Sequence, residues 1–249
     1  MMKISVLTLF PEMFHSPLKS SLIGKAIERG IIQVELINLR DFALDKHKQV
    51  DDYPFGGGAG MVIKADVALR ALEELHRTNP EVRTILMSPA GKILNQEMAR
   101  ELAGEKSLLL LCGHYEGFDE RVLTQIDDQV SIGDYILTGG EMAALVLIEV
   151  VARLIPGVLG SEKSIDDESF SDGLLEYPQY TRPRQVGDLE VPEVLLSGNH
   201  EQIRRWRKKE SIRKTLLARP DLLIKKHLDE EEKGYLMEIL FSGDGGDQQ

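Results

Sequence analysis

The first 160 residues alternate short, β-branched apolar runs with stretches of helical periodicity, and this alternation restricts the fold more than any other feature. It is the pattern of an α/β domain, in which helices cover both faces of a mostly parallel sheet. The expected strands are 3–10, 32–38, 84–88, 107–112 and 129–132. The expected helices are 18–29, 65–77, 96–102, 119–125 and 141–154.

The pattern changes after residue 160. Residues 161–175, SEKSIDDESFSDGLL, are polar and acidic without a sustained apolar period, which predicts a linker or mobile loop. From 176 to 249 the signals are helical, and a helix at 201–209 would place Ile203 and Trp206 on its inward side. The final SGDGGDQQ predicts a disordered end. We therefore expect an α/β domain at 1–160, a linker at 161–175 and a small helical domain at 176–249.

The net charge of −11 disfavours a polyanionic partner only if the charge is evenly spread. Residues 200–227 contain ten Lys and Arg but three acidic residues, so this segment carries +7 and the remainder −18. Attraction to phosphate is screened within roughly 10 Å at moderate salt, so the local excess matters more than the total. The C-terminal part is therefore the candidate surface for a polyanion.

Three other features bound the class of protein. A single cysteine, Cys112, excludes an internal disulfide and a multi-thiolate metal site and fits the reducing cytoplasm. The start MMKISVLTLFPEMF lacks the plan of a signal peptide. The longest apolar stretch, 142–159, is interrupted by Glu149, Arg153 and Pro156, so we expect a buried helix and no membrane association.

Three polar, glycine-containing loops follow predicted strands: SPAG at 88–91, CGHYEGFDERV at 112–122 and SIGDYILTGGE at 131–141. In open α/β sheets, ligands bind at this edge. The apolar side chains of the third loop are suited to enclosing a flat base while backbone groups read its edges. A plain strand–loop–helix connection explains the same spacing, with Asp134 and Glu141 as solvated or helix-capping carboxylates.

Other motifs leave their alternatives open. The glycine-rich segment 51–61 lacks both a P-loop ending and a G-x-G-x-x-G pattern, which disfavours a nucleoside triphosphate, and it is either a functional or a mobile loop. His114, Glu116 and Asp119 supply no clear ligand set, so a polar ligand loop is favoured over a zinc site. Arg153 either pairs with Glu149 one turn earlier or reaches into a cleft.

Seven segments, in this order along nearly the whole chain, resemble the bacterial tRNA (guanine-N1-)-methyltransferase family of the SPOUT superfamily. They are LFPEMF, VDDYPFGGGAGM, CGHYEGFDERV, SIGDYILTGGE, RLIPGVLG, LLEYPQYTRP and VLLSGNHEQIRRWRKKES. The resemblance implies transfer of a methyl group from S-adenosyl-L-methionine to N1 of the guanine immediately 3′ of the anticodon in tRNA. It also implies a C-terminal trefoil knot in the α/β domain, which sequence physics would not predict. A homodimer with its active site at the subunit interface is implied as well.

The same resemblance implies roles for individual residues. Glu168 would remove the N1 proton, with Asp167 and Asp172 as alternatives, and Arg153 would stabilise negative charge on O6. The implied donor contacts are Pro89, Gly113, Tyr115, Glu116, Ile132, Gly133, Asp134, Tyr135, Ile136, Leu137, Gly139 and Gly140. The implied tRNA contacts are Asp51, Arg204, Arg205, Arg207, Lys208 and Lys209.

This chain departs from the family pattern at two positions. The family has Asp where this chain has Glu168, and a misplacement near 1 Å can cost about a hundredfold in rate. The family commonly has Gln at the position of Ala90, so only backbone contacts are expected there. Trp206 either stacks on a base or belongs to the core. Magnesium is implied by the resemblance alone, and the residues themselves predict no metal site.

Two other classes of function fit parts of the sequence. A Rossmann-type methyltransferase or dehydrogenase would need a glycine fingerprint directly after the first strand, where this chain has PEMF. A non-enzymatic RNA-binding protein would explain the basic segment but would leave the three strand-end loops without a role.

Overall fold

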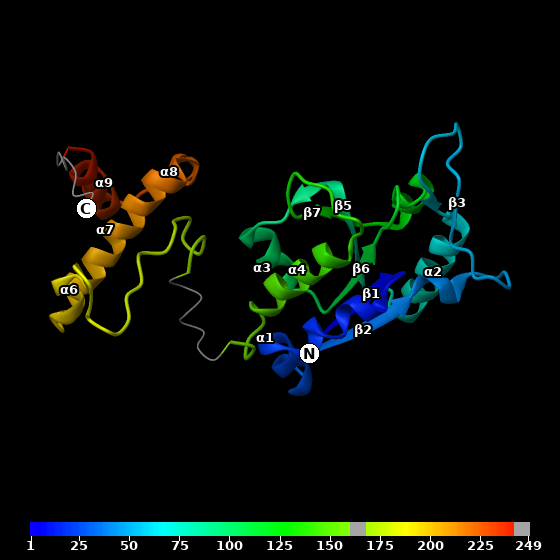
Figure 1. The fold of residues 1–249 in the computed structure, drawn as a ribbon, viewed down its shortest axis with the longest axis horizontal. Helices are drawn as coiled ribbons and strands as arrows, with labels where there is room; N and C mark the ends of the chain where they lie inside the picture. Colours follow the sequence, from blue (N-terminus) through cyan, green and yellow to red (C-terminus); the bar gives the residue numbers. More distant parts are fainter. Residues whose placement is uncertain (160–167, 242–249) are drawn as a thin grey trace. The chain divides into compact units, whose positions relative to one another are not determined.

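The computed structural model describes residues 1–159 and 168–241, and the chain forms two compact units, Met1–Gly160 and Ser161–Gln249 (Figure 1). The terminal segment expected to be disordered and the alternative base Asp167 lie outside the described residues. No helix within the described ranges combines the length and apolar character that a membrane crossing needs.

The first unit is built on a five-stranded sheet of order β2-β1-β6-β5-β7, in which every neighbouring pair is parallel. The strands are β1 (Met2–Thr8), β2 (Ile32–Asn38), β5 (Arg83–Ile93), β6 (Ser107–Cys112) and β7 (Asp128–Ser131). The predicted parallel α/β sheet is confirmed, and β2 and β6 have the predicted bounds. β5 is longer than predicted, because it continues past an irregularity between Met87 and Lys92 and pairs with β7 on both sides of it.

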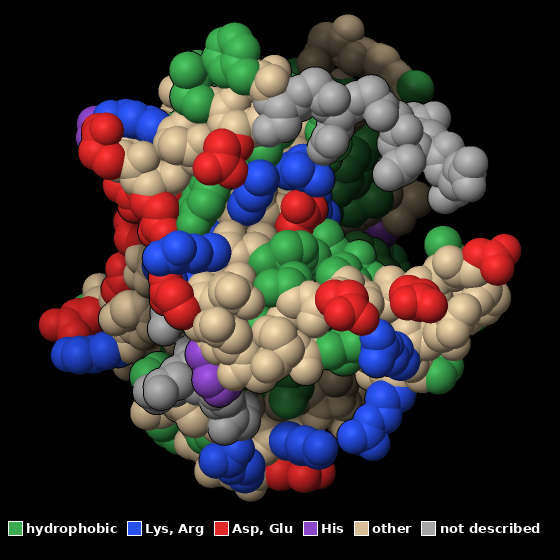
Figure 2. Space-filling view, turned by 90° about the vertical axis from the view of Figure 1, so that its left-hand side faces the viewer, with side chains coloured by type: hydrophobic (Ala, Val, Ile, Leu, Met, Phe, Trp, Pro, Cys, Tyr) green, Lys and Arg blue, Asp and Glu red, His purple; other side chains and the backbone are tan. Residues whose placement is uncertain are grey.

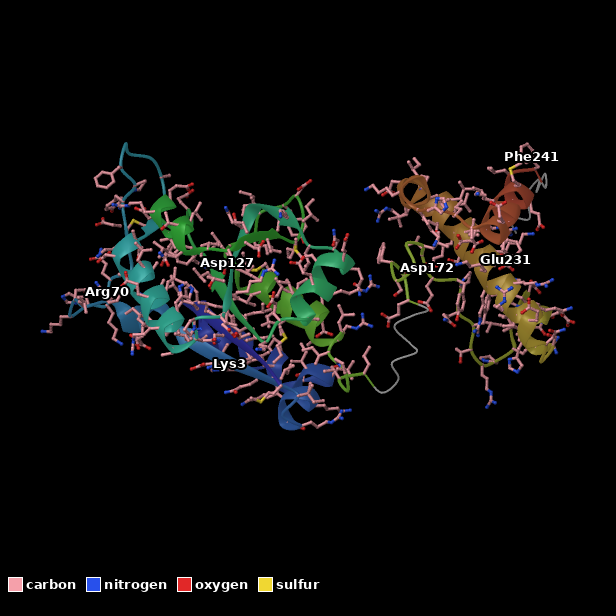
Figure 3. The ribbon with its side chains drawn as sticks, turned by 180° about the vertical axis from the view of Figure 1, so that it is seen from behind. Lys3, Arg70, Asp127, Asp172, Glu231 and Phe241 are labelled. Carbon is pink, nitrogen blue, oxygen red and sulfur yellow. The ribbon has the colours of Figure 1, made fainter. Side chains whose placement is uncertain are left out.

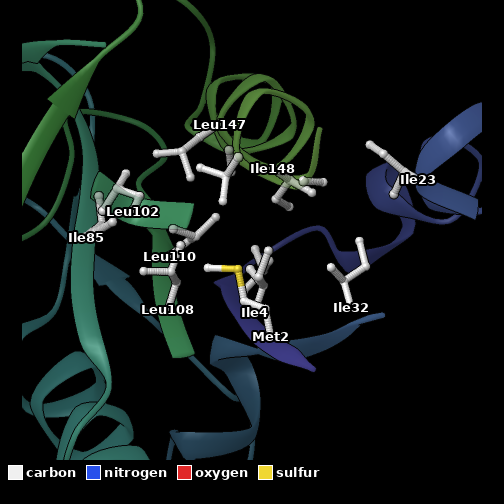
Figure 4. Packing of buried hydrophobic residues seen from close by; sticks show 14 of the residues in the cluster. Met2, Ile4, Ile23, Ile32, Ile85, Leu102, Leu108, Leu110, Leu147 and Ile148 are labelled. Atoms are coloured by element: carbon white, nitrogen blue, oxygen red, sulfur yellow. The ribbon is translucent and has the colours of Figure 1, made fainter. Parts of the chain in front are cut away.

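Helices cover both faces of this sheet, because successive strand residues point to opposite sides. Leu108 and Leu110 of β6 pack in one apolar cluster, and Leu109 and Leu111 pack in another. The first cluster includes residues of α1, α3 and α4 (Figure 4), and the second includes residues of α2. The helices are α1 (Ser21–Glu28), α2 (Ala65–Thr78), α3 (Gln96–Ala103) and α4 (Glu141–Ala152).

Short elements complete the first unit and differ from prediction at two places. They are η1 (Pro11–Phe14), η2 (Pro17–Lys19), η3 (Leu39–Phe42), η4 (Glu120–Gln125), β3 (Asp51–Asp52) and β4 (Val62–Ile63). The expected helix 18–29 is interrupted before Ser21, whose φ of 53° is not helical. The expected helix 119–125 is the 3₁₀ turn η4, which Asp119 begins by accepting a hydrogen bond from the N–H of Arg121.

The second unit is mainly helical, as predicted. Its elements are β8 (Gln185–Val186), β9 (Leu189–Glu190), α6 (Glu193–Leu196), α7 (His200–Ala218), α8 (Pro220–Lys225) and α9 (Glu230–Phe241). The expected helix 201–209 is only the first half of α7. The Asn199 side chain caps its start by accepting a hydrogen bond from the N–H of Gln202, and α8 begins directly at Pro220. Ile212 and Thr215 of α7 are fully buried in this unit.

The close approach of β5 and β7 generates a prediction about stability. A Cβ atom added at Gly91 would overlap the backbone of Gln129 and Val130, more closely than real Cβ atoms approach other atoms. We expect Gly91→Ala to lower the free energy of unfolding by about 2 kcal/mol or more. Denaturation followed by far-UV circular dichroism measures this change. In Gly104→Ala the nearest atom would lie 3.3 Å away, so this control should change stability less, and equal losses in both variants would contradict the account.

Candidate active site

The irregular part of β5 between Met87 and Lys92, which includes the predicted SPAG loop, and the loops that follow β6 and β7 line a cavity of about 520 Å³. The N–H of Gly140 donates a hydrogen bond to the carbonyl oxygen of Gly113 at 2.8 Å, and His114 forms an isolated antiparallel bridge with Gly139. The segment after β7 therefore returns to the loop after β6. These contacts shape one concave site from parts of the chain that are distant in sequence.

The site depends on glycine because chain segments approach one another closely. A Cβ atom on Gly140 would lie 2.9 Å from the Cα of Cys112, and one on Gly139 would collide with the side chains of His114 and Glu141. Gly117 and Gly133 have φ values of 102° and 144°, which side chains rarely permit. The glycines that frame these loops are therefore required by backbone geometry, as well as by the space that a ligand would need.

Apolar side chains form the outer rim of the cavity. Tyr135, Ile136 and Leu137 line it and remain 55%, 82% and 40% exposed, respectively. The Tyr135 hydroxyl donates a hydrogen bond to the carbonyl oxygen of Ile132 at 3.0 Å, which holds the ring across its own loop. Exposed apolar groups around a concave, backbone-lined cavity are suited to binding the face of an aromatic base.

A buried carboxylate, that of Glu141, lies behind the cavity. Its side chain is only 1% exposed and makes no capping hydrogen bond, so the alternative of a solvated or helix-capping carboxylate is wrong for Glu141, whereas Asp134 is exposed. Glu141 accepts a hydrogen bond of 2.8 Å from the Thr8 hydroxyl, and its Oε2 lies 3.8 Å from Nδ1 of His114. The first turn of α4 therefore connects the end of β1 with the loop after β6. The position of Glu141 at a helix start gave no signal of this burial, which arises from the folding of three loops over it.

The remaining polar groups near the cavity show no metal-binding arrangement. Among the residues that the structure describes, no three His, Cys, Asp or Glu side chains converge as ligands for a metal ion. Asp119 is instead paired with Arg121, whose hydrogen bonds lower the pKa of Asp119 to about 2. Burial raises the pKa of the Cys112 thiol, and the charge of Glu141 adds to this effect, so the thiol stays protonated and unreactive.

The structure brings together most of the residues implied as donor contacts. All of them except Asp134, which is exposed, line the cavity. Residues outside the loops named from the sequence also line it, among them Met87, Gln129 and Ala143. Arg153 directly follows α4 and is half-buried. Its backbone N–H bonds the carbonyl oxygen of Glu149.

Glu168, the expected base, belongs to the second unit. The carbonyl oxygen of Glu168 accepts a hydrogen bond of 3.1 Å from the N–H of Ser171. The alternative Asp172 forms ion pairs with Lys208 and Lys226 at 2.7 Å and 3.6 Å. Burial of Asp172 opposes its ionisation, but these ammonium groups outweigh that effect and lower its pKa, which makes it a weaker base.

The basic residues of α7 are engaged within their own unit. Lys and Arg side chains are interspersed with Asp and Glu on the face shown in Figure 2. Arg204 and Arg205 both bond Glu201, which lowers the pKa of Glu201 to about 2. The other ion pairs are Arg204–Glu231, Lys208–Glu232 and Lys209–Glu238. Glu201 is already counted in the positive excess of residues 200–227, and the carboxylates of α9 offset part of that excess.

Arg207 of α7 and Asp51 of β3 are the remaining residues expected to contact tRNA. The guanidinium carbon of Arg207 lies 4.7 Å from the ring centroid of Tyr177, and Trp206 packs against Tyr180. The alternative of Trp206 as part of a packed pair is thus supported, with Tyr180 as its partner. In the first unit, Asp51 pairs with Ile63 between β3 and β4, at the base of a loop whose Phe55 is fully exposed.

Comparison with known proteins identifies the family. A family model described as tRNA (Guanine-1)-methyltransferase TrmD matches residues 2–225. The chain is 62% identical over 240 residues to the tRNA (guanine-N(1)-)-methyltransferase of Syntrophomonas wolfei, which covers 96% of this chain and 98% of the relative. It is 51% identical over 247 residues to the enzyme of that name from Syntrophotalea carbinolica, covering 99% and 100%. The segments that enclose the cavity, and the helical unit as far as the end of α8 at Lys225, lie within the matched region, and the chain belongs to the tRNA (guanine-N1-)-methyltransferase family.

Proposed function

We propose that this enzyme transfers a methyl group from S-adenosyl-L-methionine to N1 of the guanine immediately 3′ of the anticodon in tRNA. Family membership supports the reaction class, and the glycine-framed cavity at the carboxyl edge of the sheet is the observation that carries the proposal. Its volume suits a nucleoside with a short side chain, and its backbone-rich wall suits an adenine that has no phosphate to grip. The substrate also places the enzyme in the cytoplasm, where tRNA matures.

The reaction requires two protein side chains besides those that bind the donor, a base for the N1 proton and a cation near O6. Guanine N1 carries a proton at neutral pH, so it becomes a nucleophile only as a base removes that proton. Its lone pair then forms the new N–C bond while the S–C bond of the sulfonium breaks and the sulfur leaves as a neutral thioether. We assign the base to Glu168, since Asp172 is held by two lysines. We assign Arg153 to O6, where negative charge develops and a preorganised guanidinium is most effective.

The same proposal includes a homodimer and a knotted backbone. Met142 and Val146 lie four residues apart on α4 and are 53% and 42% exposed, so this apolar helix presents an uncovered face beside the cavity. A second copy of the chain would cover this face. The return of the segment after β7 to the loop after β6 supports the trefoil knot that the family implies.

The helical unit is the proposed tRNA-binding domain and would hold the phosphates of the anticodon arm. The positive excess of residues 200–227 supports this role, although each paired cation must exchange a carboxylate for a phosphate. Asp51 and the exposed loop that follows it are proposed as contacts from the first unit. The family resemblance implies magnesium, but the described residues contain no set of side chains that fits a magnesium ion as ligands. We therefore assign magnesium no step in the reaction.

Methylation of two tRNA transcripts tests the target. The transcripts differ only by guanine or adenine immediately 3′ of the anticodon, and the enzyme receives donor labelled in its methyl group. We expect labelling of the guanine transcript alone, because adenine has no O6 for Arg153 and its unprotonated N1 offers Glu168 no hydrogen bond. Equal labelling of both transcripts would reject this target.

Replacement of Glu168 by Gln tests the base. We expect the rate of methyl transfer at saturating substrates to fall at least about a hundredfold, because the amide cannot accept the N1 proton. Donor affinity measured by calorimetry should be unchanged. Glu193→Gln, which removes an exposed carboxylate paired with Arg184, serves as the control. Near-normal turnover of Glu168→Gln would transfer the role to another carboxylate.

Mixing two inactive variants tests whether the active site is shared between subunits. Glu168→Gln lacks the base, and Gly140→Ala is expected to lack the donor site because its Cβ would approach Cys112 too closely. If each base serves the donor site of the other subunit, an equimolar mixture should regain about a quarter of wild-type activity after subunit exchange. Circular dichroism confirms that both variants are folded. An inactive mixture whose hybrid dimers are verified by mass spectrometry would contradict a shared site.

A further inference from the structure

The segment that carries Glu168 is fastened to the helical unit by backbone hydrogen bonds. The N–H of Leu175 donates to the Thr215 hydroxyl at 2.9 Å, and the Ser211 hydroxyl donates to the carbonyl oxygen of Leu175. Leu174 is only 1% exposed. Residues 168–175 belong to the segment 161–175 that sequence analysis expects to be a linker or mobile loop, and α7 supplies hydrogen-bond partners for the backbone of Leu175.

Within this segment, the chain folds back on itself next to Glu168. The N–H of Ser171 bonds the carbonyl oxygen of Glu168 at 3.1 Å, and the N–H of Phe170 bonds that of Leu174 at 2.7 Å. Phe170 adopts a φ of 72°, which is uncommon for a side chain of that size. Such a conformation persists only where surrounding contacts hold it. The turn at 168–174 therefore has a defined shape.

These contacts include a cluster of four charged side chains, Asp172, Lys208, Lys226 and Glu232, which we call the Asp172 cluster. Asp172 is labelled in Figure 3. Lys208 lies 2.7 Å from both carboxylates, and Lys226 lies 3.6 Å from Asp172 and 3.4 Å from Glu232. Lys226 also donates a hydrogen bond to the backbone carbonyl of Asp172 at 2.6 Å. The cluster thus joins the turn to α7, to the end of α8 and to α9.

The inner part of the cluster, Lys226 and Glu232, is shielded from water, whereas Lys208 and Asp172 are 27% and 47% exposed. The Glu232 and Lys226 side chains are 4% and 14% exposed, respectively, whereas both members of the Arg204–Glu201 pair are more than half exposed. Buried ion pairs are weakly screened and costly to break from one side, because the remaining charge loses its partner. Two ammonium groups face two carboxylates, so removal of one charge leaves the others unbalanced.

We propose that the Asp172 cluster is a positioning device that fixes the turn carrying the catalytic carboxylate to the helical unit, so that Glu168 moves together with the tRNA-binding domain. This inference rests on the assignment of Glu168 as the base. Asp172, Lys208 and Lys226 act through the backbone of the turn and touch no reacting atom. Because the helical unit would hold the anticodon arm, engagement of tRNA and delivery of the base become one event. Donor alone would not bring the base into place.

Two variants that leave Glu168 intact test this proposal in the full-length protein. Asp172→Asn removes one charge of the cluster, and Lys226→Met removes another without changing any residue proposed to contact tRNA. We expect each variant to lower kcat for tRNA methylation at least tenfold, since the base is no longer held in register, while KM for S-adenosylmethionine stays within about twofold. Asp172→Glu, which keeps the charge, should recover part of kcat.

Glu230→Gln is the matched control, because it removes a carboxylate of the same unit that is 91% exposed and pairs with the exposed Lys233. It should leave kcat unchanged.

Hydrogen exchange at the amides of Phe170, Leu174 and Leu175 supplies a readout that does not depend on activity, and exchange should be faster in both cluster variants. Unchanged exchange and wild-type kcat would overturn the proposal, as would a fall in kcat that only mirrors a loss of folded protein. Fast exchange with wild-type kcat would overturn positioning while leaving the proposed reaction intact. A wild-type enzyme that fails to methylate guanine-containing tRNA would instead overturn the proposed function.

Discussion

The close contact between the loop after β6 and the start of α4 is the constraint on which the site depends. Gly140 donates a hydrogen bond to Gly113 at 2.8 Å and leaves no room for a side chain against Cys112. This contact closes the segment after β7 over the carboxyl edge of the sheet. The cavity, its apolar rim and the buried Glu141 all follow from that closure, because each is formed where the returning segment meets the irregular part of β5, the loop after β6 or both.

The helical unit contributes a different kind of order. Its basic residues are balanced by acids, so the unit stabilises itself through ion pairs before any polyanion arrives. The exposed pairs contribute little to stability and are readily exchanged for phosphate contacts. The Asp172 cluster differs, because its inner charges, Lys226 and Glu232, have low exposure and because it connects a turn with three helices. We therefore assign binding to the exposed pairs and positioning of the turn to the Asp172 cluster.

The strands and most helices could be predicted from sequence because their signals are local. The alternating apolar residues of β2 and the continuous apolar run of β6 predicted the bounds that both strands have, and the boundary of the second unit coincides with a change in composition. The burial of Glu141 and the pairing of Lys208 with Asp172 could not be predicted in this way, since both depend on residues far apart in the chain. The seven-segment resemblance carried the functional expectation. It could not show that the expected phosphate-binding cations would already have acidic partners.

Hydrogen–deuterium exchange of the full-length protein, with and without S-adenosylmethionine, tests the central claim that the methyl donor binds in the cavity at the carboxyl edge. The account predicts slower exchange at the amides of residues 113–117 and 132–140 when donor is present, and no change in α7 (His200–Ala218). Protection confined to the helical unit, or none at saturating donor, would contradict it.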